Sequence, residues 1–218
     1  MDTQFMIEFG FLIVALLITR VLYLVHKVTT GFSKYTNHPR KNPCKTVICI
    51  GSGGHTTEMI ALIQNLDFNK YSPRYYVMAS NDETSEIKIK NLENEKSDKL
   101  DYSVIKIPRS RIVGQSYISS IFSTVYSIIY CIPIVFKIRP DLNLCNGPGT
   151  CIPICIITFL FNCAFLASTK IVFIESICRT ESFSLSGKIL IYFADNFLVQ
   201  WPSLKKKLKR AEYIGKLV

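Results

Sequence analysis

The chain has 218 residues and a net charge of +10, from 26 basic and 16 acidic side chains. This length suits one domain with a small appendage. The positive charge points to an anionic partner, and nucleic acid is disfavoured because no recognised basic motif accompanies the charge. Charged residues make up 19% of the chain, below the roughly 25% of typical soluble domains, and the shortfall comes with long uncharged runs.

The first of these runs extends from Phe5 to Val25 and is interrupted by Glu8 and Arg20 near its ends. About 20 apolar residues span a bilayer, and charged side chains near the ends of a span reach the interface. No basic residue precedes the run and no small-residue cleavage site follows it, which favours an uncleaved signal anchor over a signal peptide. We therefore predict a single transmembrane helix within residues 1–26.

A basic segment follows the anchor, and Pro39 and Pro43 mark its end. By the positive-inside rule, this segment and the domain behind it lie in the cytosol. The bases concerned are Lys27, Lys34, Arg40, Lys41 and Lys45. The prediction is a cytosolic linker in residues 27–44 and one domain in residues 45–218.

Strand and helix patterns alternate throughout that domain. The predicted strands are 46–50, 74–80, 101–107, 141–145, 170–176 and 196–201. The predicted helices are 56–66, 85–99, 117–138, 151–168, 186–194 and 202–210. This order is typical of a Rossmann-like α/β fold with a parallel sheet covered on both faces. Helices 117–138 and 151–168 are apolar and nearly long enough to span a bilayer, but they are read as crossover helices, and Pro133 should kink or end the first.

The first strand runs directly into the stretch GSGGHTTE, residues 51–58. Glycine lets the backbone approach a ligand closely, and the free N–H groups of a helix start favour an anion. We expect Thr56 or Thr57 to cap the helix and Glu58 to stabilise its first turn. The loop lacks the Gly at position 56 of the dinucleotide fingerprint and the Gly-Lys of the P-loop. It is read as a phosphate or diphosphate cradle, with a tight turn needed only for packing as the alternative.

Three further loops should reach the same edge, because ligands of doubly wound sheets bind beyond the carboxyl ends of the strands. They are residues 108–116, 146–150 and 175–182, and arginine in such loops binds phosphate with paired hydrogen bonds. The predicted diphosphate-binding residues are Ser52, Gly53, Gly54, His55, Thr56, Arg109, Arg111, Ser116, Gly147, Gly149, Thr150 and Arg179. His55 is also the candidate general base, since imidazole titrates near neutral pH; contact with the diphosphate is its other possible role.

The eight cysteines show no CxxC pair, and His26, His38 and His55 are scattered. Cys151 and Cys155 lie in an apolar run. We interpret the cysteines as buried free thiols in a reducing compartment, with no metal-ligand set.

Four segments carry a resemblance to a known family: PRSRIVGQS, NGPGT, ESICRTESFSLSGKILIYFADNFLVQWP and the terminal YIGKLV. They resemble the membrane-anchoring subunits of the dolichol-pathway N-acetylglucosaminyltransferase, the asparagine-linked-glycosylation protein fourteen family. The GSGGHT loop is shared more widely, including with MurG. The resemblance covers the whole chain.

The resemblance implies the N-terminal, acceptor-binding half of a GT-B glycosyltransferase, inactive alone. A soluble partner, of the protein thirteen type, would bind the UDP-N-acetylglucosamine donor, so this chain needs no cofactor. The joined, inverting enzyme would add the second N-acetylglucosamine, in β1,4 linkage, to dolichyl-diphosphate-N-acetylglucosamine at the cytosolic face of the endoplasmic reticulum membrane. The C-terminal tail would dock the partner, through Tyr213, Ile214, Leu217 and Val218.

Two other classes stay open. A membrane-tethered scaffold that only recruits a partner would tolerate loss of His55 and of the loop glycines. A nucleotide-dependent oxidoreductase is disfavoured by Thr56, and because Asn81 or Asp82 is the only candidate for binding the ribose.

Overall fold

The computed structural model of the chain describes residues 3–30, 40–96, 101–112, 114–147 and 149–216. Its centre is a seven-stranded sheet in the order β3-β2-β1-β4-β5-β6-β7, with every neighbouring pair parallel. The strands are β1 Thr46–Cys49, β2 Arg74–Ala79, β3 Tyr102–Ile107, β4 Leu142–Asn146, β5 Lys170–Ile174, β6 Asn196–Val199 and β7 Glu212–Tyr213. The predicted Rossmann-like α/β class is confirmed.

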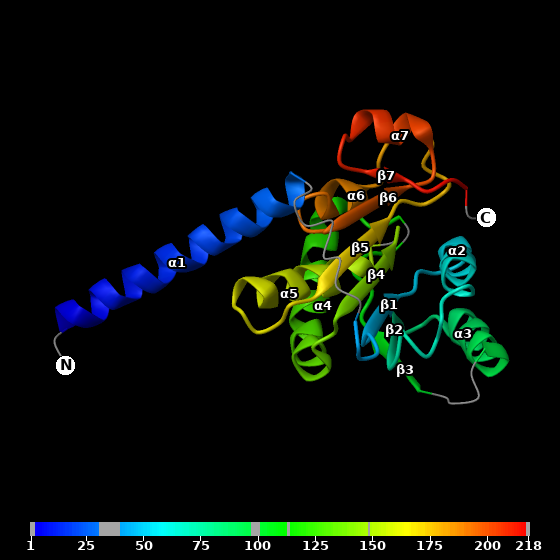
Figure 1. Cartoon of the computed structure of the whole chain (residues 1–218), viewed down its shortest axis with the longest axis horizontal. Coiled ribbons are helices and arrows are strands. Elements are labelled where there is room, and N and C mark those ends of the chain that lie inside the picture. The colour runs from blue at the N-terminus through cyan, green and yellow to red at the C-terminus, as the bar shows by residue number, and fades with distance from the viewer. Residues whose placement is uncertain (1–2, 31–39, 97–100, 113, 148, 217–218) are drawn as a thin grey trace.

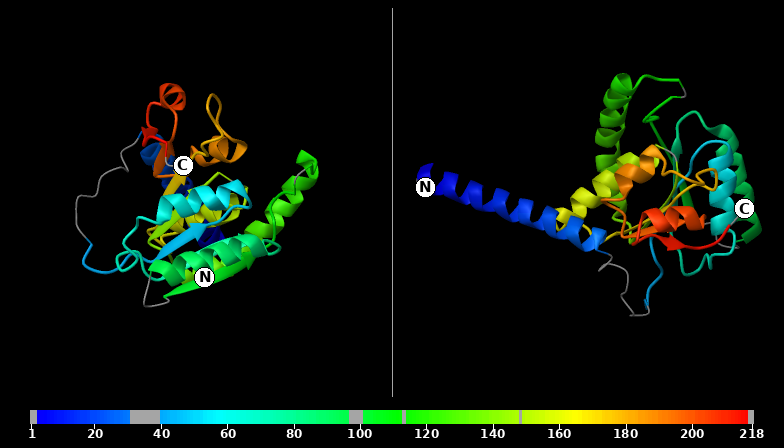
Figure 2. Two further views of the ribbon diagram at one scale, coloured as in Figure 1. Left: turned by 90° about the vertical axis from the view of Figure 1, so that its right-hand side faces the viewer. Right: turned by 90° about the horizontal axis from the view of Figure 1, so that it is seen from above.

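Helices cover both faces of this sheet (Figures 1 and 2). They are α2 Gly54–Ile63, α3 Glu83–Lys96, α4 Tyr117–Ile138, α5 Cys151–Cys163, α6 Leu185–Leu190 and α7 Pro202–Lys207. One core layer joins α2 and α3 to the sheet, with Met59, Ile89 and Ile48 among its members. The other joins α4, α5 and α6 to the opposite face, with Val135 and Ile154 among its members. Each crossover helix therefore buries an apolar stripe, as the sequence pattern predicts.

Several element ends differ from the predictions. Pro133 does not end α4, which continues to Ile138. The fifth helix stops at Cys163 rather than residue 168, because Phe165 adopts a left-handed φ of 58° and the Asn162 side chain pairs with the backbone of Thr169. The C-terminal helix stops at Lys207, and the unpredicted strand β7 follows it.

The N-terminal helix α1, Thr3–Thr29, projects away from the domain (Figure 1). Its 18-residue apolar window has a mean hydropathy of 2.2 and is not buried at all, as expected for a membrane anchor. Near its C-terminal end, the Arg20 guanidinium stacks 4.3 Å from the ring centre of Phe165. Half of the predicted linker, residues 31–39, lies outside the described residues.

The segment Ile118–Ile138 of α4 is also long and apolar enough to cross a membrane. Its Cys131, Val135 and Ile138 are buried against the sheet, which supports the prediction of a crossover helix. The opposite side of the helix exposes Ile118 and Phe122, each with 74% of its surface accessible. α4 thus combines a core-facing side with an apolar outer side.

The strand order reverses between β1 and β4, which pair directly. At such a reversal the connections leave the two strands in opposite directions and open a crevice at their carboxyl ends. The GSGGH loop follows β1 and the NGPGT loop follows β4, so both of the predicted glycine loops lie at this crevice.

Candidate active site at the carboxyl edge of the sheet

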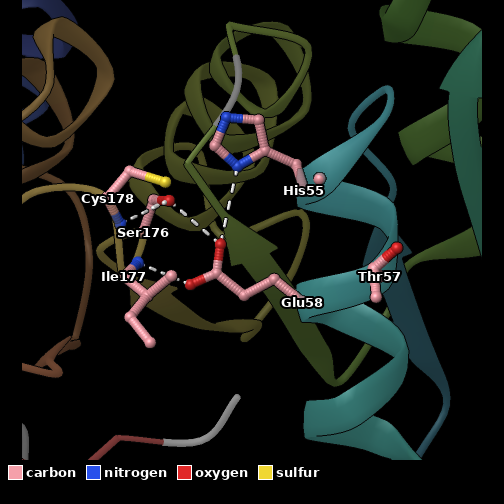
Figure 3. Close-up of a pocket in the computed structure, with 7 residues that line it drawn as sticks. His55, Thr57, Glu58, Ser176, Ile177 and Cys178 are labelled. Atoms are coloured by element: carbon pink, nitrogen blue, oxygen red, sulfur yellow. Dashed lines mark hydrogen bonds and ion pairs between the residues drawn. The ribbon is translucent and has the colours of Figure 1, made fainter.

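A pocket of about 460 Å³ opens at this edge. It lies between the start of α2 and the loop after β5 (Figure 3). The residues that line it are Gly54, His55, Thr57, Glu58, Ser176, Ile177 and Cys178. Figure 3 shows His55 and Glu58 projecting from α2 toward the 176–178 loop, while Thr57 points to the other side of the helix.

The glycine loop turns through a conformation that favours glycine. Gly53 has φ 63° and ψ −122° and occupies the N-cap position of α2. The prediction of a threonine cap is therefore wrong. The Thr56 side chain is buried, donates to the carbonyl of Gly51, and lies 2.6 Å from the Ser85 hydroxyl. Thr56 holds the loop together from within, which corrects its predicted role as a ligand-binding residue.

The His55 ring is oriented by two acceptors on one nitrogen. Its Nδ1 lies 3.3 Å from Asn146 Oδ1 and 3.7 Å from Glu58 Oε2. Because both neighbours accept hydrogen bonds, Nδ1 carries the proton in neutral imidazole and Nε2 keeps its lone pair. The ring rests against Gly147, where an added Cβ would come within 2.6 Å of Cε1. The structure therefore prepares Nε2 of a half-exposed histidine to accept a proton.

Glu58 does not act at the helix start, because α2 begins at Gly54 and its first turn contains no acid. Its buried carboxylate instead accepts hydrogen bonds from Ser176 Oγ at 3.0 Å and Ile177 N at 2.6 Å, and from the Gln200 side chain. Burial opposes ionisation, but these donors and His55 lower the pKa of Glu58. The Glu58 carboxylate in turn raises the pKa of His55.

The three predicted arginines differ in their contacts. Arg109 donates from Nε to Asn81 Oδ1 and from Nη2 to Ser52 Oγ, both at 2.8 Å, so it joins the loops after β1, β2 and β3. Arg111 donates to the Gln115 carbonyl within its own loop, at 3.2 Å. Arg179 is exposed in the loop after β5. Arg109 thus contacts the glycine loop through Ser52.

Four further predicted residues lie in the loops that lead into α4 and α5. Ser116 caps α4 by accepting from Ser119 N at 3.2 Å, which gives it a structural role where a diphosphate contact was expected. Thr150 occupies the N-cap position of α5 without a side-chain cap bond, and Gly149 precedes it in open space. Gly147 has φ 63° and packs on His55. Two residues of the NGPGT loop therefore contact His55, Gly147 by packing and Asn146 through its side chain.

Sequence reasoning missed Asn146, Ser176 and Gln200, which orient His55 directly or through Glu58. Asn146 ends β4, while Ser176 and Gln200 follow β5 and β6. Their only sequence signal was a polar side chain at the carboxyl end of an apolar strand, the place where ligand sites of this fold lie.

All eight cysteines are free, and six of them are buried, as predicted. The structure also brings the sulfur atoms of Cys49, Cys145 and Cys151 within 4.8 Å of one another. The sequence did not predict this grouping. Spacing along the chain could not reveal it, because the three residues come from β1, β4 and α5.

A doubly wound parallel sheet with a pocket at its carboxyl edge defines the Rossmann-like class, whose members bind ligands at that edge. Residues 46–217 match the family described as "Oligosaccharide biosynthesis protein Alg14 like". The chain therefore belongs to the Alg14-like family.

Similar proteins carry the name UDP-N-acetylglucosamine transferase subunit ALG14. The one from Mus musculus is 45% identical over 205 residues, covering 91% of this chain and 94% of its own length. The one from Homo sapiens is 45% identical over 203 residues, covering 90% and 93%. The one from Yarrowia lipolytica is 40% identical and covers both chains completely.

Among solved structures, the fold resembles that of MurG from Acinetobacter baumannii, with a TM-score of 0.52 and 12% identity. The match covers 73% of this chain and 42% of the MurG chain. At this identity the likeness establishes the shared fold.

Proposed function

We propose that this chain is the membrane-anchored, acceptor-binding subunit of a UDP-N-acetylglucosamine transferase. Its family and the names of its relatives support the role of transferase subunit. In this proposal the acceptor is dolichyl-diphosphate-N-acetylglucosamine, and the reaction adds a second N-acetylglucosamine in β1,4 linkage. A soluble partner, which this chain recruits, supplies the donor-binding lobe. The match to MurG supports a second lobe, because it covers 42% of the MurG chain.

The observation that carries the proposal is the arrangement of His55. Its Nδ1 faces the acceptors Asn146 and Glu58, and its ring lines the pocket at the carboxyl edge of the sheet. A scaffold that only recruits a partner has no use for a histidine held in one tautomer beside a pocket. A group that removes a proton from a bound hydroxyl needs this arrangement.

The acceptor diphosphate is assigned to the start of α2 and the glycine loop. Gly53 and Gly54 border open space, since a Cβ at either position would meet no atom within 4 Å, so a ligand can approach the backbone there. Arg109 lies beside them through its bond to Ser52 and adds positive charge. The N-terminus of a ten-residue helix and a guanidinium together suit the negative charge of a diphosphate.

The proposed chemistry is a single displacement at the anomeric carbon. His55 Nε2 takes the proton of the acceptor 4-hydroxyl as its oxygen attacks, the bond to UDP breaks, and UDP leaves with the bonding electrons. The configuration inverts because attack and departure occur on opposite faces of the sugar. Glu58 stabilises the imidazolium that forms, as a buried carboxylate does for a catalytic histidine. The diphosphate-contact role of His55 is the alternative that kinetics must separate.

The membrane assignment rests on α1. We propose that α1 is a single-pass anchor in the endoplasmic reticulum membrane and that the domain faces the cytosol. The basic residues after the anchor and the free thiols support this orientation. In this position the pocket can meet an acceptor whose lipid is held in the same bilayer.

Purification with and without the soluble subunit, followed by a transfer assay, tests the proposal. The chain alone should transfer no N-acetylglucosamine, and adding the partner should restore transfer to the lipid acceptor. Robust turnover by the chain alone would refute the half-enzyme assignment. Full activity of a complex that lacks both His55 and the loop glycines would favour the recruitment scaffold.

A further inference from the structure

Four cysteines meet inside the protein where α5 crosses the strands that carry the active-site loops. Cys49 and Cys145 are direct register partners on the neighbouring strands β1 and β4. Cys151 and Cys155 lie four residues apart on α5, so they face the sheet from successive turns. All four side chains are completely buried. Two strands and one helix thus direct four thiols to one place.

The distances suit a thiolate metal site. The sulfur atoms of Cys49, Cys145 and Cys151 all lie within 4.8 Å of one another, and the Cys155 sulfur is 3.3 Å from that of Cys145. Four thiolates around Zn²⁺ at about 2.3 Å place the sulfurs about 3.8 Å apart, so the sulfurs of Cys49, Cys145 and Cys151 need shifts of up to about 1 Å, and the Cys155 sulfur must turn from Cys145 toward the other two. Side-chain rotations at buried cysteines can supply shifts of that size.

The buried side-chain amide of Asn143 makes polar contacts with these sulfurs. Asn143 Oδ1 lies 3.6 Å from the Cys49 sulfur and 3.4 Å from the Cys145 sulfur. Its Nδ2 donates to the Cys155 sulfur at 3.7 Å. The Cys49 and Cys145 thiols donate to Oδ1 and lose these bonds when they are deprotonated, whereas the Nδ2 donor suits a thiolate, and donors of this kind orient metal ligands in protein sites. Asn143 is fully buried and contacts the sulfurs of three of the four cysteines.

We propose that Cys49, Cys145, Cys151 and Cys155 bind one Zn²⁺ ion in a closed, structural site. Soft thiolates select zinc over the harder cations, and four protein ligands leave no open position for catalysis. The ion would link β1, β4 and α5. The GSGGH loop follows β1, and the NGPGT loop connects β4 to α5. Binding releases the thiol protons to solvent, so zinc affinity should rise with pH. The site is independent of the proposed transferase activity.

The test uses the full-length chain in detergent under reducing conditions. The exposed Cys178 and the half-buried Cys44 are first replaced by serine. These two thiols lie outside the cluster and could otherwise bind the metal at the surface. After exposure to Zn²⁺ and dialysis, elemental analysis should find one zinc per chain. Replacement by Cd²⁺ should give the ultraviolet charge-transfer band of a cadmium–thiolate site, and zinc should raise the melting temperature.

Variants in the same background identify the ligands. Cys49→Ser and Cys151→Ser should lose the zinc, and Asn143→Ala should weaken its affinity by roughly 10–100-fold, as is usual for groups that orient ligands. Cys131→Ser and Cys163→Ser, at buried thiols outside the cluster, should keep the full zinc content. The proposal is overturned if the background chain binds no zinc and gives no cadmium–thiolate band. That result comes from the background chain, whose serine replacements lie at the half-buried Cys44 and the exposed Cys178, so it does not depend on whether any variant of the cluster folds.

Discussion

Glu58 and His55, three residues apart on α2, act as one unit: Glu58 Oε2 lies 3.7 Å from Nδ1 of His55. The same carboxylate is held by Ser176, by the Ile177 N–H and by Gln200 (Figure 3). The orientation of the histidine therefore depends on the loop after β5 and on the end of β6. Loss of the carboxylate should change both the geometry and the titration of the imidazole.

Glu58→Gln tests this dependence through the pH profile. A general base must be neutral, so activity is lost as the pH falls through the His55 pKa. The carboxylate raises that pKa, and removing it lowers the pKa, so the acid limb of kcat/KM should move to lower pH while kcat falls. Glu83→Gln, at an exposed position of α3, should leave the profile unchanged. An unchanged acid limb in the Glu58→Gln variant would show that Glu58 does not influence the titration of His55.

Gly54→Ala probes the approach of the acceptor without disturbing the fold. A Cβ at this position meets no protein atom within 4 Å, and the residue is already helical. Stability should therefore match the wild type, while the KM for the acceptor rises because the diphosphate can no longer approach the backbone. Gly53 is a poorer probe, since its φ of 63° would strain any substituted residue. A wild-type KM would show that the acceptor does not contact the loop at Gly54.

Gly147→Ala should damage both stability and turnover. The new Cβ would lie 2.6 Å from Cε1 of His55, at a residue with φ 63°. The left-handed backbone alone costs about 1–2 kcal/mol, and the displaced ring loses its alignment. Thermal unfolding and kcat measure the two effects. Gly149→Ala is the control for stability, because its Cβ would meet no atom within 4 Å. Equal melting temperatures for the two variants would contradict the packing argument.

Arg109→Ala should raise the KM for the acceptor more than Arg111→Ala does. Arg109 holds Ser52 and Asn81 at 2.8 Å beside the glycine loop, whereas Arg111 bonds to the Gln115 carbonyl of its own loop. A hydrogen bond to a charged group contributes about 1.5–3 kcal/mol, which corresponds to a KM increase of about ten- to a hundred-fold. Steady-state assays with varied acceptor compare the two. Equal increases in KM for the two variants would show that Arg109 contributes no more to acceptor binding than Arg111 does.

The C-terminal tail is the proposed docking segment for the soluble partner. Tyr213 lies in the outermost strand, β7, and is 48% exposed, while Ile214 N donates to the Val199 carbonyl at 3.1 Å. Leu217 and Val218 lie outside the described residues. Removing residues 214–218 should abolish co-purification of the partner and leave the cooperative unfolding of the domain intact. Leu185→Ala, at an exposed apolar residue on α6, should not affect co-purification.

The fold was predictable because alternating apolar strands and amphipathic helices are local patterns. His55 was predictable for the same reason, since the glycine loop that carries it follows β1 directly. Strand β7 was missed because two residues give no recognisable pattern. The cap at Gly53 was missed because a threonine cap fits the sequence equally well, and only the backbone conformation distinguishes them.

The residues that orient His55 could not be predicted from the sequence, for a different reason. The bond from Ser176 to Glu58 spans 118 residues, and the bond from Gln200 to Glu58 spans 142. The thiol cluster likewise combines β1, β4 and α5. Contacts between such distant residues depend on strand order and register, which the sequence of one chain does not specify.

The assignment of His55 is tested most directly by steady-state kinetics of the His55→Ala complex with varied acceptor. Replacing a general base should lower kcat by roughly 10²–10⁴-fold, with partner binding and membrane attachment unchanged. A histidine that only contacts the diphosphate would instead change mainly KM, by the 1.5–3 kcal/mol typical of a hydrogen bond to a charged group. We predict the large fall in kcat. A His55→Ala complex with wild-type kcat and wild-type KM would contradict the account.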